Sequence, residues 1–283
     1  MTRRPSTGEL LLGVLVAALV AFVGIQVLAA PRKLGASTRR TLTARDSASI
    51  ASQYRSQISM RRGASAVPPW LAEIQIARLL AAAERDVGGR DAVVRPPADS
   101  VRAMLATAER GTYLRAMLGQ DGEVARWHES AEPIRVWVQP QSTERGFSPE
   151  FIAPTRRAFT AWNELALGVT FAIVEDSTEA DVHVMWSSGM PGIGQLGTTF
   201  RMTGGAGWIA FARVVLCTSY DIYTVQNAAR HEAGHVLGLG HSPEVRDIMA
   251  AATEGRQYQL TDADRGTAEW LYRLPPGPIE NRE

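Results

Sequence analysis

The spacing of apolar residues changes near residue 131, and this change divides the chain into two parts. Upstream, apolar positions recur at helical spacing in residues 70–86 and 101–118, and glycine or proline bounds both stretches. Downstream, short alternating runs typical of strands are mixed with longer amphipathic runs. We therefore predict an α+β domain over residues 131–276, preceded by a helical, partly disordered spacer over residues 31–130.

The predicted domain has the order strand, helix, three strands, helix, helix. The strands are expected at residues 134–139, 169–175, 180–186 and 208–216, and the helices at residues 148–167, 223–237 and 261–272. Ser100 and Ser148 are expected to begin helices, and Thr261 with Asp264 has the spacing of a capping box. The glycine-rich residues 189–207 are expected to form a connection without a strand.

The N-terminal residues 10–30 are apolar for most of their length and carry no charged side chain. A helix of this length, at about 1.5 Å per residue, crosses a hydrocarbon core of roughly 30 Å. We predict a transmembrane anchor here, with residues 1–9 as a tail before it and residues 277–283 as a tail after the domain. Two alternatives remain open, namely a signal segment cleaved after residue 29 and a buried helix of a soluble domain.

Composition excludes two further classes of function. The net charge of +1, from 30 basic and 29 acidic residues, leaves no electrostatic footprint for nucleic acid, so no such partner is expected. The single cysteine, Cys217, excludes an internal disulfide framework and structural zinc sites of the Cys₄ or Cys₂His₂ type. Any metal site must therefore be built from histidine and carboxylate side chains.

Three of the five histidines lie in the stretch HEAGHVLGLGH, residues 231–241. On a helix, His231 and His235 project from one face, one turn apart, so both imidazoles can share a single ion. Glu232, next to the first histidine, points beside that ion rather than at it. This is the position that a general base for a metal-bound water requires.

The glycines of the same stretch explain how a third ligand is reached. Gly238 and Gly240 are expected to let the chain leave the helix in a left-handed conformation and to bring His241 back toward the other two histidines. Three neutral imidazoles leave one tetrahedral position open, which is typical of a catalytic zinc site. The alternative is a histidine-rich helix end with imidazoles satisfied in the core.

These residues match the HExxHxxGxxH pattern of the metzincin metalloproteases, and Ser242, directly after the third histidine, resembles the matrixin branch. Met249 is similar to the methionine of the family's Met-turn, which forms an apolar floor under the histidines. Residues 260–272, LTDADRGTAEWLY, resemble the matrixin C-terminal helix. In that helix Asp264 corresponds to the aspartate that braces the Met-turn.

The resemblance covers residues 131–274 and implies a metzincin-like catalytic domain. Such a domain has a twisted mixed sheet, two long helices of which one carries the zinc ligands, a Met-turn and a C-terminal helix. One catalytic zinc ion is expected, and structural calcium is not evident. Two departures put activation through a propeptide in question: no cysteine precedes the domain, and Ala263 stands where matrixins often have an aspartate that receives a new N-terminus. A propeptide or lid at residues 31–130 is the alternative to the spacer.

Two other residues are considered and are not assigned to the site. His183 has no histidine nearby in its predicted strand and is expected to be a packed or edge-strand residue. Tyr258 is not expected to act on the substrate, because family members that use a tyrosine place it two residues after the methionine, where this chain has Ala251.

The function we expect is that of a zinc metalloendopeptidase, in which a zinc-activated water attacks the peptide bond and Glu232 is the general base. The polypeptide substrate is expected to lie along an edge strand near residues 207–213, with a side-chain pocket lined by the motif helix and residues 249–258. The alternatives are a membrane-tethered binding module with an inactive zinc site and a hydrolase of non-peptide amides.

The expected location is a single-pass membrane protein with an extracytoplasmic catalytic domain, or a secreted protein if residues 1–29 are cleaved. The flanking charges alone favour the opposite orientation, because Arg3 and Arg4 precede the apolar segment while a larger group of basic residues follows it. The resemblance to a secreted protease family decides the orientation that we predict. The oligomeric state is left open.

Overall fold

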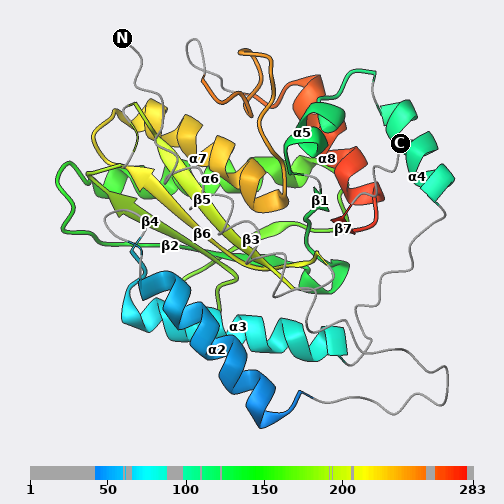
Figure 1. Cartoon of the computed structure of the whole chain (residues 1–283). Coiled ribbons are helices and arrows are strands. Elements are labelled where there is room, and N and C mark those ends of the chain that lie inside the picture. The colour runs from blue at the N-terminus through cyan, green and yellow to red at the C-terminus, as the bar shows by residue number, and fades with distance from the viewer. Residues whose placement is uncertain are drawn as a thin grey trace, which may run out of the picture. The chain divides into compact units, whose positions relative to one another are not determined.

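A computed structural model describes the chain downstream of the predicted anchor (Figure 1). The described residues are 42–59, 61, 66–87, 98–108, 110–121, 123–190, 192, 194–204, 207–252 and 259–278. The predicted anchor at residues 10–30 lies outside these ranges, so it stays a prediction. Among the helices that are described, none combines the length and the apolar character needed to span a bilayer.

A five-stranded mixed sheet forms the centre of the fold (Figure 1). Its strands are β2 (Ile134–Val138), β3 (Phe171–Val174), β4 (Val182–Ser187), β5 (Gly197–Thr203) and β6 (Ile209–Cys217). They lie in the order β3-β2-β4-β6-β5, and only β5 runs antiparallel to its neighbour. The α+β class predicted from the sequence is therefore confirmed.

The position of the sheet edge differs from the prediction. The expected edge strand at residues 207–213 belongs to β6, which lies inside the sheet between β4 and β5. The edge strand next to β6 is β5, and β3 is the other edge of the sheet; β5 runs through the glycine-rich segment that was expected to contain no strand. Successive side chains of GTTFRMT lie on alternate faces of the strand. The glycines around this stretch hide the alternation of apolar and polar residues that would predict a strand.

One face of the sheet is covered by α6 (Ile152–Thr160) and α7 (Ile222–Leu237) (Figure 1). The predicted helix at residues 148–167 is segmented: Ser148 caps a 3₁₀ turn, α6 follows, and a second 3₁₀ turn ends at Glu164. The segment stops there because the Asn163 side chain exchanges two hydrogen bonds with the backbone of Phe171 and turns the chain into β3.

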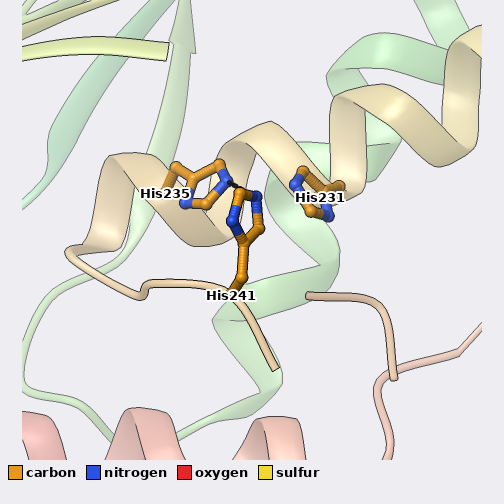
Figure 2. A group of neighbouring side chains, drawn as sticks. All are labelled: His231, His235 and His241. Atoms are coloured by element: carbon orange, nitrogen blue, oxygen red, sulfur yellow. Dashed lines mark hydrogen bonds between the residues drawn. The ribbon is translucent and has the colours of Figure 1, made fainter. Parts of the chain in front are cut away.

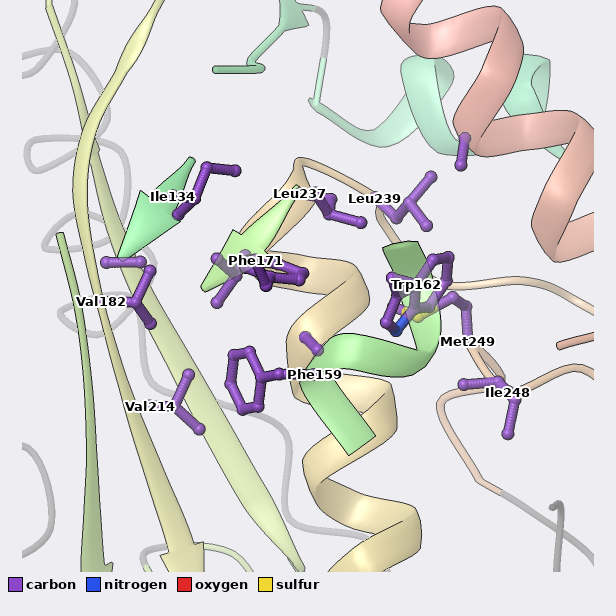
Figure 3. Packing of buried hydrophobic residues seen from close by; sticks show 14 of the residues in the cluster. Ile134, Phe159, Trp162, Phe171, Val182, Val214, Leu237, Leu239, Ile248 and Met249 are labelled. Carbon is purple, nitrogen blue, oxygen red and sulfur yellow. The ribbon is translucent and has the colours of Figure 1, made fainter. Parts of the chain in front are cut away.

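The main core lies between this face of the sheet and the two helices. Figure 3 shows Phe159 reaching from α6 toward the strand residues Val214 and Phe171, while Trp162 lies beside Met249. The same core continues beneath the C-terminal end of α7, where Leu237 and Leu239 are fully buried. The helix that carries the histidine motif is therefore fixed on its apolar side by the largest block of buried side chains in the described fold.

The core also extends upstream of residue 131. The elements concerned are α4 (Ala98–Ala108), α5 (Leu114–Asp121) and the short strand β1 (Glu123–Val124), which pairs with β7 (Gly277–Pro278). Leu114 and Met117 of α5 lie in the main core, and α4 and α5 contact α8 (Asp262–Arg273). α4 begins at Ala98, so Ser100 lies within the first turn and the prediction that it begins the helix was wrong. These residues therefore pack as part of the same unit as the five-stranded sheet.

The opposite face of the sheet is covered by a helical hairpin from the N-terminal part, α2 (Ala44–Ser59) and α3 (Pro69–Val87) (Figure 1). Tyr54 of α2 packs edge-on against Phe211 of β6, and Ile76 and Leu79 of α3 join the same cluster. With α7 on one face and this hairpin on the other, every residue of β6 is buried, which accounts for its nearly continuous apolar sequence.

His183 lies under this hairpin. Its ring in β4 is 1% exposed, lies between Trp70 and Trp137, and donates from Nε2 to the carbonyl of Ser177 at 2.8 Å. Burial lowers the pKa of His183 to about 4, and the nearby Arg78 guanidinium adds to this effect. His183 is therefore a packed neutral histidine, one of the two outcomes expected from the sequence.

This burial predicts a pH-dependent stability. In the unfolded chain His183 is protonated below about pH 6.5, whereas in the folded protein it stays neutral down to about pH 4. The contribution of His183 to the free energy of unfolding is fully present above pH 6.5. It is lost as the pH falls toward 4, by up to about 3 kcal/mol. Urea unfolding of the wild type and of His183→Gln at pH 7, 6, 5 and 4 measures it.

The variant keeps a side-chain donor for Ser177 but has no titrating ring, so its unfolding free energy should fall less steeply with acidification. The other histidines contribute equally to both proteins and cancel in the difference. Identical pH dependence in the two proteins would contradict the assignment.

Candidate metal centre

The helix α7 places two of the three motif histidines. It begins after Asp221, whose carboxylate accepts from the backbone N–H groups of Tyr223 and Thr224, and it runs through residue 237. His231 and His235 lie one turn apart and project from the same face (Figure 2). A single well-capped helix therefore sets the relative position of the first two imidazoles.

The helix ends at Gly238, which has a φ of 111° in the left-handed region. A Cβ at this position would overlap the carbonyl oxygen of Ala125, so both the conformation and the space demand glycine. Gly240 is not among the glycines with positive φ, so the expected left-handed conformation is found at Gly238 alone. The chain then turns and brings His241 toward the helix (Figure 2).

The three imidazoles converge. One ring nitrogen of each of His231, His235 and His241 lies within 4.8 Å of the other two. The Nε2 atoms of His235 and His241 are 3.2 Å apart. Two ligands at about 2.0–2.1 Å from a tetrahedral zinc ion are separated by roughly 3.3 Å, so this spacing fits one ion.

The hydrogen bonds of the other ring nitrogens fix the tautomers. Nδ1 of His231 lies 2.7 Å from the carbonyl oxygen of Ile248, and Nδ1 of His235 lies 2.8 Å from that of Leu239. A carbonyl can only accept, so Nδ1 carries the proton and Nε2 keeps its lone pair. Burial lowers the pKa of both histidines below the ordinary value. Both are therefore neutral near pH 7 and can act as metal ligands.

Glu232 lies between α7 and the edge strand β5. Its side chain is buried, and its Oε2 accepts a hydrogen bond of 2.6 Å from the hydroxyl of Thr199. Burial raises the pKa of Glu232 to about 7, while the hydrogen bond from Thr199 acts in the opposite direction. A carboxyl group with a pKa near neutrality can both accept and release a proton at physiological pH.

The C-terminal carbonyl groups of α7 have donors from distant parts of the chain. The indole of Trp127 donates to Val236 at 2.8 Å, the phenol of Tyr272 donates to Leu237 at 3.1 Å, and the guanidinium of Arg201 donates to His235 at 2.8 Å. Carbonyls in the last turn of a helix lack the N–H partner four residues further on, although that of His235 also accepts from the backbone N–H of Gly238 at 3.0 Å. Three side chains from three other elements thus hold the turn that carries His235.

Met249 is fully buried, next to Trp162 (Figure 3) and against Gly234 of α7. Gly234, in the turn between the two helical histidines, makes this approach possible, because a Cβ there would overlap the sulfur of Met249 and lie 2.9 Å from the Trp162 ring. The indole of Trp162 also donates to the carbonyl of Arg230 at 3.0 Å. The side chain of Met249 therefore occupies the space that Gly234 leaves beside α7 because it has no Cβ.

Asp264 joins the turn around Met249 to α8. Its fully buried carboxylate accepts from the backbone N–H groups of Ile248 at 2.9 Å and Met249 at 3.3 Å, and it forms the capping box with Thr261. Tyr113, from the segment before α5, adds a phenol hydrogen bond of 3.2 Å. The carbonyl of Ile248 is the acceptor for His231, so Asp264 supports that imidazole through one residue.

Most of the predicted site residues meet here. The three histidines converge, Glu232 lies beside them, and Met249, Gly238 and Asp264 surround the ligand helix. Ser242 ties the loop together, because its backbone N–H donates to the carbonyl of Met249 and its hydroxyl donates to Asp247. Tyr258 and most of the predicted pocket wall, residues 253–258, lie outside the described residues.

Sequence reasoning missed five contributors: Thr199, Arg201, Gly234, Tyr113 and Trp127. Only Gly234 lies within the motif, where a glycine in a helix interior is a detectable signal of close packing. The other four reach the site through the tertiary fold.

Comparison with known families agrees with this geometry. A family model described as Matrixin matches residues 127–273, which is slightly more than half of the chain. The chain therefore belongs to the matrixin family. The matched region begins just after β1 and ends with α8, so it includes the whole five-stranded sheet and the three histidines.

Three plant proteins are similar to the chain. Metalloendoproteinase 1 of Glycine max is 28% identical over 153 residues, which cover 46% of this chain and 50% of that protein. Metalloendoproteinase 2-MMP of Arabidopsis thaliana is 24% identical over 53% of this chain and 44% of the relative, and 1-MMP is 32% identical over 44% and 37%. The similar region thus spans half or less of each relative.

The contact between Gly234 and Met249 predicts the effect of one added methyl group. Gly234→Ala improves helix propensity by about 1 kcal/mol, but overpacking a rigid core costs about 1–3 kcal/mol. Because Met249 and Trp162 are almost fully buried, we expect a net loss of about 1 kcal/mol in unfolding free energy, measured by urea denaturation. Gly189→Ala is the matched control, since a Cβ there meets nothing within 4 Å and should leave stability unchanged. A Gly234→Ala protein as stable as the wild type would show that Met249 and Trp162 can move to make room for the methyl group.

The Asp264 network predicts a larger effect. Asp264→Asn replaces one accepting oxygen by an NH₂ group, which then faces at least two donors in a buried site. We expect a loss of about 3 kcal/mol in unfolding free energy. Asp262→Asn, an exposed carboxylate in the same first turn of α8, is the control and should cost less than about 0.5 kcal/mol. Equal losses from the two substitutions would refute a special role for Asp264.

Proposed function

We propose that the chain is a zinc-dependent metalloendopeptidase. The observation that carries the proposal is the convergence of three imidazoles with a buried glutamate beside them, in a chain of the matrixin family. The proposed metal ligands are His231, His235 and His241. The similar plant proteins, whose names describe metalloendoproteinases, support the same reaction class.

When bound, zinc supplies a Lewis acid that polarises the scissile carbonyl and lowers the pKa of a water molecule. The residues of the chain then have distinct tasks. Glu232 accepts the proton of the attacking water and passes it to the leaving amine. Met249, Gly238 and Asp264 keep the ligand helix and the following loop in place.

The edge strand β5 is the proposed docking site for the substrate backbone. Among the described residues, β5 pairs with β6 on one side only, so its other side offers N–H and C=O groups. An extended peptide added there would be held by main-chain hydrogen bonds whatever its sequence. Because Thr199 of β5 contacts Glu232, such a peptide would lie next to the proposed general base.

The intact glutamate separates this function from one of the two alternatives, the inactive binding module. A binding module with an inactive zinc site has no chemical need for Glu232, yet the side chain is present, buried and hydrogen-bonded. A hydrolase of non-peptide amides would use the same residues, so only substrate profiling distinguishes it. Cleavage restricted to small amides in a library that includes peptides would favour that alternative.

The decisive variant is Glu232→Gln in the full-length chain, which keeps the shape of the side chain and removes its basicity. We expect about one zinc per chain in both proteins and a fall in casein cleavage of about 100-fold or more. Zinc is measured by atomic absorption and cleavage by release of labelled peptides. Glu244→Gln, at an exposed carboxylate three residues after the third histidine, should leave both unchanged. A folded wild type that binds no zinc, or undiminished cleavage by Glu232→Gln, would sink the proposal.

A further inference from the structure

Glu232 is held from the edge strand by two neighbouring features of β5. The Thr199 hydroxyl lies 2.6 Å from Oε2 and 3.3 Å from the backbone carbonyl of Glu232. A hydroxyl has only one proton to donate. The carboxylate oxygen is both the nearer and the stronger of the two acceptors. The carboxylate is therefore the partner of Thr199.

The other carboxylate oxygen faces bare backbone. A Cβ built at Gly197 would lie 2.7 Å from Oε1 of Glu232, so the carboxylate is lodged against a position without a side chain. One oxygen is committed to Thr199 and the other has no bulky neighbour on β5. The two oxygens therefore have different roles: Oε2 accepts from Thr199, and Oε1 remains to bind the proton that is transferred.

The bond from Thr199 persists in both states of the base. When Oε1 binds a proton, Oε2 becomes a carbonyl oxygen, which still accepts from a hydroxyl. Arg201, two residues along on the same face of β5, donates to the carbonyl of His235 at 2.8 Å and so fixes the helix from the same strand. The carboxylate and its helix are thus held by alternate side chains of one strand.

We propose that Thr199 is a positioning residue that orients Glu232 for proton transfer. The hydroxyl does not touch the substrate and exchanges no proton with it. It holds Oε2 so that Oε1 points in one direction through the whole cycle. This inference rests on the proposed peptidase function.

The test compares Thr199→Val with Thr199→Ser in the full-length, zinc-loaded chain. The valine has the same shape without the hydroxyl, and we expect kcat to fall by about 10- to 100-fold with KM changed less than about twofold. The serine restores the hydroxyl and should recover kcat to within about threefold. Zinc content should stay at about one equivalent in both variants.

A second readout does not depend on activity. In zinc-free protein with ¹³C-labelled glutamate, the carboxyl signal that disappears in Glu232→Gln belongs to Glu232. That signal should shift in Thr199→Val and return toward its original position in Thr199→Ser. Thr218→Val is the matched control, because it removes a buried hydroxyl that donates at 2.6 Å to the carbonyl of Arg145, away from Glu232. It should change neither kcat nor the carboxyl signal.

The outcomes separate the two proposals. A wild type that binds zinc but cleaves no peptide refutes the peptidase. A cleaving wild type with an unchanged kcat in Thr199→Val, or an equal loss of kcat in Thr218→Val, overturns the role of Thr199 alone. An unshifted Glu232 signal in Thr199→Val does the same.

Discussion

Two imidazoles on one helix can share an ion with a third that follows six residues later only if the chain reverses direction between them, as it must between His235 and His241. That reversal takes place at Gly238, in a left-handed conformation and against the carbonyl of Ala125, where no Cβ fits. The carbonyls exposed by the end of the helix then need donors. Trp127, Arg201 and Tyr272 supply them from a segment before the sheet, from the edge strand and from α8. Much of the surrounding architecture can be understood as support for this one turn.

The sequence was sufficient wherever the chemistry is local. The spacing of His231, His235 and His241, the glycine at 238 and the capping box at Thr261 are fixed by helix geometry over a few residues, and all of them lie as expected. The edge strand was not recognised, because β5 lies in a glycine-rich segment that masks its alternation. Its identity depends on pairing with β6, a contact that no local pattern contains.

The remaining differences have the same origin. Tyr113 and Thr199 belong to no sequence motif. Each contributes to the site only because the fold brings it within hydrogen-bonding distance of a carboxylate, Asp264 for Tyr113 and Glu232 for Thr199. The hairpin of α2 and α3 lies on the sheet face opposite α7, so among the described residues it covers the back of β6 rather than the histidines (Figure 1). Its burial of Phe211 makes it a structural layer of the domain.

The links between α8 and the site have a consequence for the order in which the protein matures. All three histidines are translated before Asp264 and Tyr272, and the ribosome adds those two only with the last helix described. Until α8 docks, the backbone N–H of Ile248, whose carbonyl orients His231, lacks the Asp264 carboxylate, and the carbonyl of Leu237 lacks the phenol of Tyr272. A nascent chain therefore contains all three histidines before these supports exist, and their arrangement is complete only once α8 has docked.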